Sequence, residues 1–329
     1  MKEQTQTKVQ VTRREFLSSA AAAAALSMIP LHFRCASQNR SNFGGVQIGA
    51  ITYSFRSMPG SAEEILDYCV RSGIGSIELM SPAVEQYAGI PESPPRPARG
   101  AEISEEERAA YNAAREAATE EIRKWRLSPP MEKFEALRKM YNNEGVNIHI
   151  VKFSPATWSD EEVDYTFKAA KALGAYGVSD ELGEEACQRL GPFAEKYNMY
   201  AVFHNHRQPA ETGFSFDPFL EMSSANMLNF DAGHFFGCTG LHPNTIIEKY
   251  HDRIKSVHLK DFMGPESDPP DTAMPWGQGE TPLADVLLLI QREGWPINCD
   301  IELEYTIPEE SDAVTEVAKC VEYCRNILV

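Results

Sequence analysis

The stretch YAVFHNHRQ, residues 200–208, begins as an apolar strand and ends in two histidines separated by one residue. Because residues i and i+2 of a strand share a face, His204 and His206 are expected to point the same way. The chain has only eight histidines, so a pair at the end of a buried strand either fills a polar gap or reaches for a ligand. The rest of the sequence is needed to distinguish a structural role for this pair from ligand binding.

Seven further apolar runs resemble this one, and helical patterns lie between them. The eight predicted strands are residues 46–55, 76–80, 146–153, 175–181, 200–206, 227–235, 254–262 and 298–305. Strands that alternate with helices indicate parallel βαβ units, and eight such units close a barrel. The alternative is a doubly wound open sheet, but no Gly-x-Gly-x-x-Gly turn follows the first strand to support it. We therefore predict a (β/α)8 TIM barrel.

One connection is much longer than the others. Residues 81–145 lie between the second and third predicted strands and include the proline-rich PESPPRPARG and the charged SEEERAAYNAAREAATEEIRKW. Long insertions in compact domains are usually functional or disordered. We predict that this segment is a helical lid or a contact between subunits of a homo-oligomer. After the first strand, Ser61 and Glu64 have the spacing of a capping box at the start of a helix.

The first 37 residues differ in character from the rest. Arg13 and Arg14 precede an alanine-rich apolar run, which is the order of a twin-arginine export signal. The run is too short to span a membrane comfortably. We predict periplasmic export, a signal over residues 1–37, a single barrel domain over 38–329 and no transmembrane segment in the mature chain. Lipid attachment at Cys35 has little support, because an arginine stands directly before it.

The charge of the chain limits its partners. It carries 48 acidic and 31 basic residues, which gives a net charge of −17. Such an acidic surface repels phosphate backbones, so nucleic acid is not expected as a partner.

Polar side chains occupy the carboxyl end of almost every predicted strand, where barrel enzymes hold their functional groups. Burying them without partners would cost roughly 1–3 kcal/mol each, so their recurrence indicates a site. They are Glu78, Lys152, Glu181, His204, His206, Asp231, His234, His258, Lys260, Asp261, Glu302 and Glu304.

Asp231, His258 and Glu302 form the strongest subset. Carboxylates and an imidazole from successive strands suit a divalent ion such as Mn²⁺, Mg²⁺, Co²⁺ or Zn²⁺. Singly, each has a structural explanation, as a helix cap, a core histidine or a salt-bridge partner. By strand parity Glu302 and Glu304 share a face, and two carboxylates near a metal would separate in pKa. We assign Glu302 to the metal and Glu304 to acid–base catalysis or substrate contact.

The motifs FDAGHF, VHLKDF, PWGQGETPL and IELEY, in this order, resemble the xylose isomerase-like barrel superfamily of sugar phosphate isomerases and epimerases over residues 46–329. The resemblance implies metal binding by Asp231, His258 and Glu302 and places His234 at the substrate site. Many members carry a metal-binding glutamate where this chain has His204. Either His204 binds the ion directly, or Glu181 supplies the missing carboxylate.

The remaining residues receive roles around this metal. Lys152 is expected to stabilise a developing oxyanion, and His206 to contact the substrate or shuttle a proton. Trp276, in the PWGQG loop, offers an apolar face for a sugar ring. The predicted catalytic groups are Glu304, His206, Lys152 and Glu181, and the predicted substrate contacts are His234, Lys260, Asp261, Trp276 and Glu78.

We therefore predict an enzyme with one divalent metal ion that isomerises or epimerises a small carbohydrate by removing a proton next to a carbonyl. A dehydratase or lyase acting on a keto-sugar or keto-inositol would share that first step, and export favours it somewhat because sugar phosphates are mainly intracellular. A sugar-binding barrel without catalysis is a further alternative. Repair of abasic DNA, which similar barrels perform, is disfavoured by the acidic charge.

Overall fold

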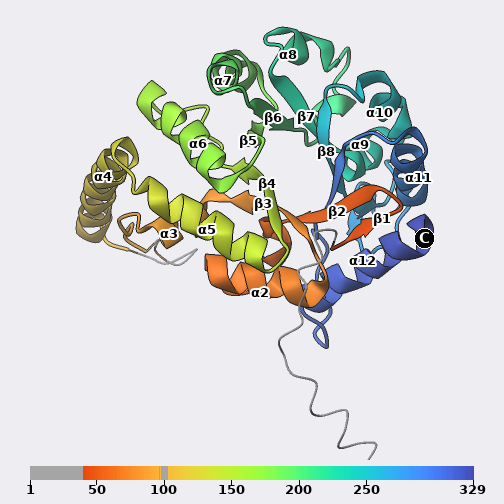
Figure 1. Ribbon diagram of the computed structural model, residues 1–329, viewed down its shortest axis with the longest axis horizontal. Coiled ribbons are helices and arrows are strands. Elements are labelled where there is room, and N and C mark those ends of the chain that lie inside the picture. The colour runs from red at the N-terminus through yellow and green to blue at the C-terminus, as the bar shows by residue number, and fades with distance from the viewer. Residues whose placement is uncertain (1–39, 96, 98–102) are drawn as a thin grey trace, which may run out of the picture. The chain divides into compact units, whose positions relative to one another are not determined.

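The computed structural model of the protein describes residues 40–95, 97 and 103–329. Eight parallel strands form one sheet that closes on itself where β2 pairs with β3 (Figure 1). They are β2 (Val46–Ile51), β3 (Ser76–Met80), β4 (Asn147–Lys152), β5 (Gly177–Glu181), β6 (Tyr200–His204), β7 (Asn226–Asp231), β8 (Ile254–Leu259) and β11 (Asn298–Ile301). The predicted (β/α)8 TIM barrel is confirmed. A short strand, β1 (Asn42–Phe43), pairs antiparallel with β2.

Helices surround the strands (Figure 1). The α-helices are α2 (Ala62–Ser72), α3 (Ser81–Ala88), α4 (Glu105–Leu127), α5 (Met131–Asn143), α6 (Asp160–Leu173), α7 (Glu184–Tyr197), α8 (Asp217–Glu221), α9 (Ala232–Thr239), α10 (Asn244–Tyr250), α11 (Leu283–Glu293) and α12 (Ala313–Leu328). Two short 3-10 helices, η1 (Thr52–Phe55) and η2 (Gln208–Ala210), follow β2 and β6. The predicted capping box begins α2, where the Ser61 side chain accepts from the Glu64 backbone and the Glu64 side chain accepts from the Ser61 backbone.

Several strands end earlier than predicted. Residues 232–235 belong to helix α9, because the Asp231 side chain accepts a hydrogen bond from the backbone N–H of His234 and caps that helix. Residues 302–305 lie beyond β11, so strand parity does not apply to Glu302 and Glu304. His206 likewise lies beyond β6. Asp261 and Phe262 form β9, which pairs with β10 (Ala273–Met274) in a separate two-stranded sheet.

The insertion between β3 and β4 consists of α3, α4 and α5 in its described part. None of the residues of the 23-residue helix α4 is buried. Its carboxyl end is fixed by Arg126, which forms a bidentate ion pair with Glu85 of α3 at 2.8 and 3.1 Å and an ion pair with Glu162 of α6 at 3.2 Å. The Arg126 guanidinium also stacks 3.6 Å from the ring centroid of Trp158. A lid or an oligomer contact remains a prediction for this segment.

The predicted export signal, including Cys35, lies outside the described residues. Among the helices that the structure describes, none combines the length and the apolar character that a membrane span requires.

Candidate metal centre and catalytic rim

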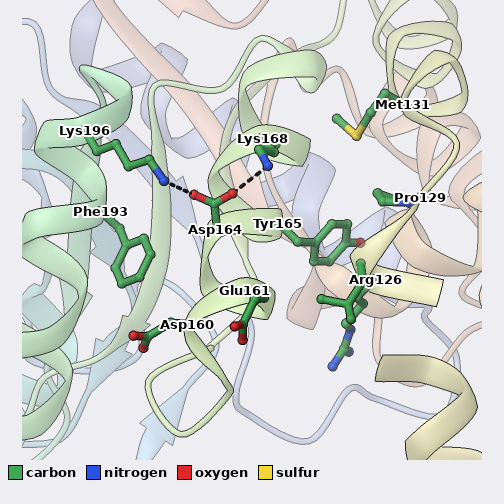
Figure 2. A pocket seen from close by; sticks show the side chains of 11 residues that line it. Arg126, Pro129, Met131, Asp160, Glu161, Asp164, Tyr165, Lys168, Phe193 and Lys196 are labelled. Atoms are coloured by element: carbon green, nitrogen blue, oxygen red, sulfur yellow. Dashed lines mark hydrogen bonds and ion pairs between the residues drawn. The ribbon is translucent and has the colours of Figure 1, made fainter. Parts of the chain in front are cut away.

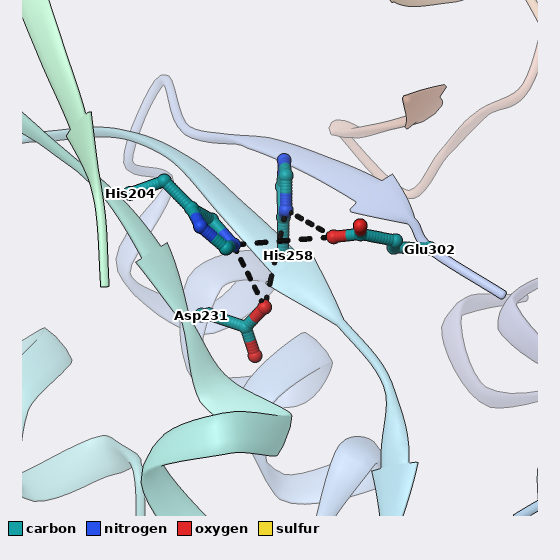
Figure 3. Close-up of side chains that lie close together, drawn as sticks. All are labelled: His204, Asp231, His258 and Glu302. Atoms are coloured by element: carbon teal, nitrogen blue, oxygen red, sulfur yellow. Dashed lines mark hydrogen bonds and ion pairs between the residues drawn. The ribbon is translucent and has the colours of Figure 1, made fainter. Parts of the chain in front are cut away.

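Four side chains converge at the carboxyl ends of the barrel strands (Figure 3). His204 ends β6, Asp231 ends β7, His258 lies in β8 and Glu302 follows β11, and each offers one ligand-type atom within 4.8 Å of the others. All four are buried. The structure therefore brings together the three predicted ligands, Asp231, His258 and Glu302, and adds His204 rather than Glu181 to that group.

The two imidazoles are oriented for coordination. Nδ1 of His258 lies 2.7 Å from Oε2 of Glu302, whereas its Nε2 lies 2.7 Å from Oε2 of the fully buried Glu78. In His204, Nε2 lies 3.0 Å from Oδ2 of Asp231, and Nδ1 lies 3.2 Å from Glu181. Each ring thus turns one nitrogen to the cluster and the other to an outer carboxylate. Metal-binding histidines are usually held in this way.

The buried carboxylates are strongly acidic in this arrangement. Burial opposes the charged form of Asp231, but Lys260 and the neighbouring histidines outweigh it and hold the carboxyl pKa well below its usual value. Burial also opposes protonation of His258, yet the charges of Glu302 and Glu78 raise its pKa to about 10. A donor set of two carboxylates and two imidazoles within this spacing fits a divalent ion such as Mn²⁺, Co²⁺ or Zn²⁺. Such an ion would displace the proton from His258.

Lys260 is the cation that faces the cluster. Its Nζ lies 2.9 Å from Oδ2 of Asp231, 3.1 Å from Oε2 of Glu302 and 3.0 Å from Oε1 of Glu304. These carboxylates outweigh the effect of burial and raise the lysine pKa. An ion held by Asp231 and Glu302 would share their oxygens with this ammonium group, which also has Glu304 as a partner.

A second, more exposed set of groups lies beside the cluster. Nζ of Lys152 lies 2.6 Å from Oε1 of Glu181, and Nε2 of His206 lies 2.9 Å from Oε2 of the same carboxylate. The side chains of Glu181 and His206 are 44% and 48% exposed. Burial opposes the charged form of Glu181, but its bonds to His204 and His206 and the charge of Lys152 lower its pKa. Glu181 is therefore an ionised carboxylate that solvent can reach.

The opposite end of this set is formed by His234 and Glu304. Nδ1 of His206 lies 3.4 Å from Nε2 of His234, and that nitrogen lies 3.5 Å from Oε2 of Glu304. His234 also lies 3.0 Å from Nζ of Lys260. A continuous arc of groups able to exchange protons thus runs from Lys152 to Glu304 beside the cluster of His204, Asp231, His258 and Glu302.

With this geometry established, comparison with known proteins identifies the family. The sequence pattern of the xylose isomerase-like TIM barrel matches residues 144–324, more than half of the chain. The chain belongs to the xylose isomerase-like TIM barrel family. Those residues contain all four members of the cluster.

The share of the chain that is matched differs between sequence relatives and solved structures. An inosose dehydratase from Lacticaseibacillus casei is 33% identical over 84 residues, which are 25% of this chain and 28% of the relative. The chain thus matches less than a third of that relative's length. A sugar phosphate isomerase/epimerase from Parabacteroides distasonis superposes with a TM-score of 0.53 at 15% identity, over 87% of this chain and 96% of the other. A 3-keto-D-glucoside 4-epimerase from E. coli gives 0.55 at 9% identity, over 85% and 99%. These two structures share the fold.

Three predicted substrate contacts of this barrel have other neighbours in the structure. Glu78 lies behind His258 with no exposed surface, so it is placed to orient that ring and not to touch a substrate. Asp261 accepts hydrogen bonds from the backbone N–H groups of Gly277, Gly279 and Thr281 and thereby holds the PWGQGET loop. Because both oxygens of a 3% exposed carboxylate are engaged there, the predicted substrate contact of Asp261 is replaced by a loop-holding role.

The third is Trp276, whose ring packs edge-on against Tyr323 of α12 at 5.6 Å between centroids. With Tyr305 and Pro308 it lines a separate hollow of about 210 Å³. Stacking of a sugar on Trp276 stays a prediction.

Two asparagines complete the site, and neither was assigned a role from the sequence. Asn205 lies between the two histidines of the opening stretch, and its Oδ1 accepts a hydrogen bond from the backbone N–H of Asp231. Asn229 donates to Oε2 of Glu78 at 2.7 Å and lies 3.1 Å from Nε2 of His258. Strand parity could have found Asn229, because it precedes Asp231 by two residues and faces the same side.

Two hollows of the described surface, of about 690 and 750 Å³, lie away from this site. One of about 690 Å³ lies between the start of α5 and helices α6 and α7, with Asp164 and its lysine partners on its wall (Figure 2). None of the residues lining it was predicted to take part in the site.

Proposed function

We propose that this protein is a divalent-metal-dependent enzyme that isomerises or epimerises a small carbohydrate by removing a proton next to a carbonyl. One observation carries the proposal. Two imidazoles and two carboxylates meet within 4.8 Å at the catalytic end of the barrel, and ionisable groups line the side that solvent reaches. A bound divalent ion would hold adjacent substrate oxygens and polarise the carbonyl.

The residues of the chain supply the proton transfers. Glu181 is ionised and exposed, so it can accept a proton from a carbon atom, and His206 at 2.9 Å can pass that proton to solvent. Lys152, beside Glu181, places a positive charge where an enediolate oxygen would develop its negative charge. Glu304 and His234 lie at the other end of the arc and can return a proton from a different direction. Inversion of a carbon centre requires one group that removes a proton and a second group that returns it, and the two ends of the arc supply such groups.

Dehydration is the second candidate. It begins with the same proton abstraction, after which a hydroxyl group leaves, and the relatives matched at 33–37% identity over parts of their length are inosose dehydratases. Lys152, which is protonated beside Glu181, can donate a proton to such a leaving hydroxyl group.

The decisive experiment joins metal analysis to product analysis. The purified mature protein should contain about one divalent ion per chain by elemental mass spectrometry. Keto-sugars and keto-glycosides incubated with it in D₂O should give an isomer that carries one solvent deuterium. Loss of water from the substrate would assign dehydration instead, and release of a second fragment would assign a lyase. Ligand-dependent stabilisation without any turnover would show a sugar-binding barrel.

A further inference from the structure

The interior of the barrel holds a second polar group of residues below the metal cluster. Glu78 of β3 and Asp300 of β11 are both fully buried, and each has a carboxylate oxygen within 4.8 Å of the other and of a ring nitrogen of His258. Asn229 of β7 is also fully buried and directs its amide to Glu78. Two acidic side chains are therefore neighbours in a region without solvent.

In each carboxylate, one oxygen has hydrogen-bond partners and the other has none among the described residues. Oε2 of Glu78 accepts from Asn229 and lies 2.7 Å from His258, and Oδ2 of Asp300 lies 2.8 Å from Nε2 of His149. Oε1 of Glu78, Oδ1 of Asp300 and Oδ1 of Asn229 are buried and find no hydrogen-bond partner among the described residues. Bare buried oxygens cost roughly 1–3 kcal/mol each, and more when charged. Three of them on neighbouring side chains indicate a ligand.

A glycine brings the main chain of a neighbouring strand close to Asp300. β2 lies between β11 and β3 in the sheet, and its Gly49 is paired with Asp300. A Cβ atom at Gly49 would lie 2.0 Å from Oδ1 of Asp300. A side chain at this position would collide with the Asp300 carboxylate, so glycine is what lets Oδ1 of Asp300 lie against the main chain of β2.

The chemistry of the three oxygens favours a cation over water. All three oxygens are hydrogen-bond acceptors, and two of them belong to carboxylates. A water molecule has only two hydrogens to donate, so one water molecule cannot satisfy all three. Two oxygens at about 2.4 Å from a cation the size of Ca²⁺ or Na⁺ lie at most about 4.8 Å apart, and one carboxylate oxygen of Glu78 and one of Asp300 lie within 4.8 Å of each other. A single charge suits a position next to a divalent ion, since repulsion between the two ions is then smaller.

We propose that a monovalent alkali cation binds inside the barrel between Glu78 and Asp300. Hydrogen-bonded polar side chains continue from Asp300 through His149 to the amino-terminal end of the barrel. There Asn298 donates to Ser76, Ser76 lies 2.8 Å from Nδ1 of His149, and Ser76 and Asn298 line a hollow of about 520 Å³. The cation would fix the Glu78 carboxylate whose other oxygen orients His258.

Melting in different salts tests this site without any substrate. With EDTA present and the ionic strength held constant, the melting temperature should be about 2–4 °C higher in NaCl or KCl than in N-methylglucamine chloride. Asp300→Asn should abolish this difference, whereas Asp164→Asn, a matched change on the outer surface, should keep it. Equal melting of the wild-type protein in all three salts would overturn the proposal, whatever the variants do.

A high-resolution crystal structure in NaCl gives an independent answer. An ion should lie about 2.4 Å from Oε1 of Glu78 and from Oδ1 of Asp300. A peak about 2.8 Å from these oxygens would be a water molecule and would refute the cation. Neither readout depends on turnover, so failure of the proposed function would leave this result unchanged.

Discussion

Two clusters of charged side chains in this molecule look alike in composition and differ in burial. In the hollow of Figure 2, Asp164 lies 2.6 Å from Nζ of Lys168 and also pairs with Lys196, and both lysine side chains are more than half exposed. In the cluster of Figure 3, Asp231 has no exposed surface, and the fully buried Lys260 is shared among three carboxylates.

The difference separates a surface ion pair from a candidate site. Asp164 is balanced by flexible lysines that water also stabilises, and such pairs contribute little to stability. At the barrel end, two carboxylates and two imidazoles are fixed within 4.8 Å of one another in a region that water hardly reaches, and such a donor set suits a divalent ion. A hollow of about 690 Å³ belongs to the first cluster, so a large cavity does not by itself locate the chemistry here.

The sharpest test of this comparison removes one ligand from the buried cluster. Asp231→Asn keeps the size of the side chain but loses its charge, and we expect divalent-metal affinity to fall by more than about 100-fold, beyond the usual effect of an outer partner. Elemental analysis after dialysis measures it, with Asp164→Asn as the control that keeps its metal. Full metal content in Asp231→Asn would remove the distinction between the two clusters.

The next test separates ligand from base at the rim. Glu181→Gln should retain the metal and lower kcat by about 10²–10⁴-fold, because an amide cannot accept the proton. Steady-state kinetics and metal content are measured on the same preparation. If the variant loses its metal instead, Glu181 is a metal ligand, and His204 cannot hold the ion without it.

A smaller effect is expected behind the cluster. Glu78→Gln removes the charge that faces Nε2 of His258, and we expect metal affinity to fall by about 10–100-fold, as for other partners of metal-binding histidines. Competition with a chelating dye measures the dissociation constant of the metal. An unchanged affinity would show that Glu78 does not orient the ring.

The smallest effect belongs to the outer surface. Partial burial opposes the charge of Asp164, but bonds from Lys168, Lys196 and Tyr197 outweigh it and lower the carboxyl pKa to about 2. Its stabilising contribution is therefore present above the unfolded pKa of about 3.9 and is lost as the pH falls towards 2. Asp164→Asn should lower the free energy of unfolding by about 1 kcal/mol or less at neutral pH. Urea titrations at pH 7 and pH 2.5 should show that the difference shrinks in acid, and a constant difference would contradict this account.

Strand periodicity located the barrel, because buried parallel strands are short apolar runs that any local reading detects. It did not locate where strands end. Asp231 stops β7 by capping α9, and this depends on a side chain turning back to the backbone N–H of His234. Residues 302–305 continue an apolar and acidic alternation without strand pairing, so Glu302 and Glu304 meet at Lys260 through contacts that parity could not supply.

The sequence alone determined which residue types stand at the strand ends, and therefore which chemistry was available. Only the tertiary structure decided which of them share a centre and which support it: Glu78 turned out to lie behind His258, Asp261 to hold a loop, and Asn229 to belong to the interior. The physical reason is that closing a barrel brings strands far apart in the chain into contact. Burial and hydrogen bonding then assign each polar group its partner, and neither is encoded in local spacing.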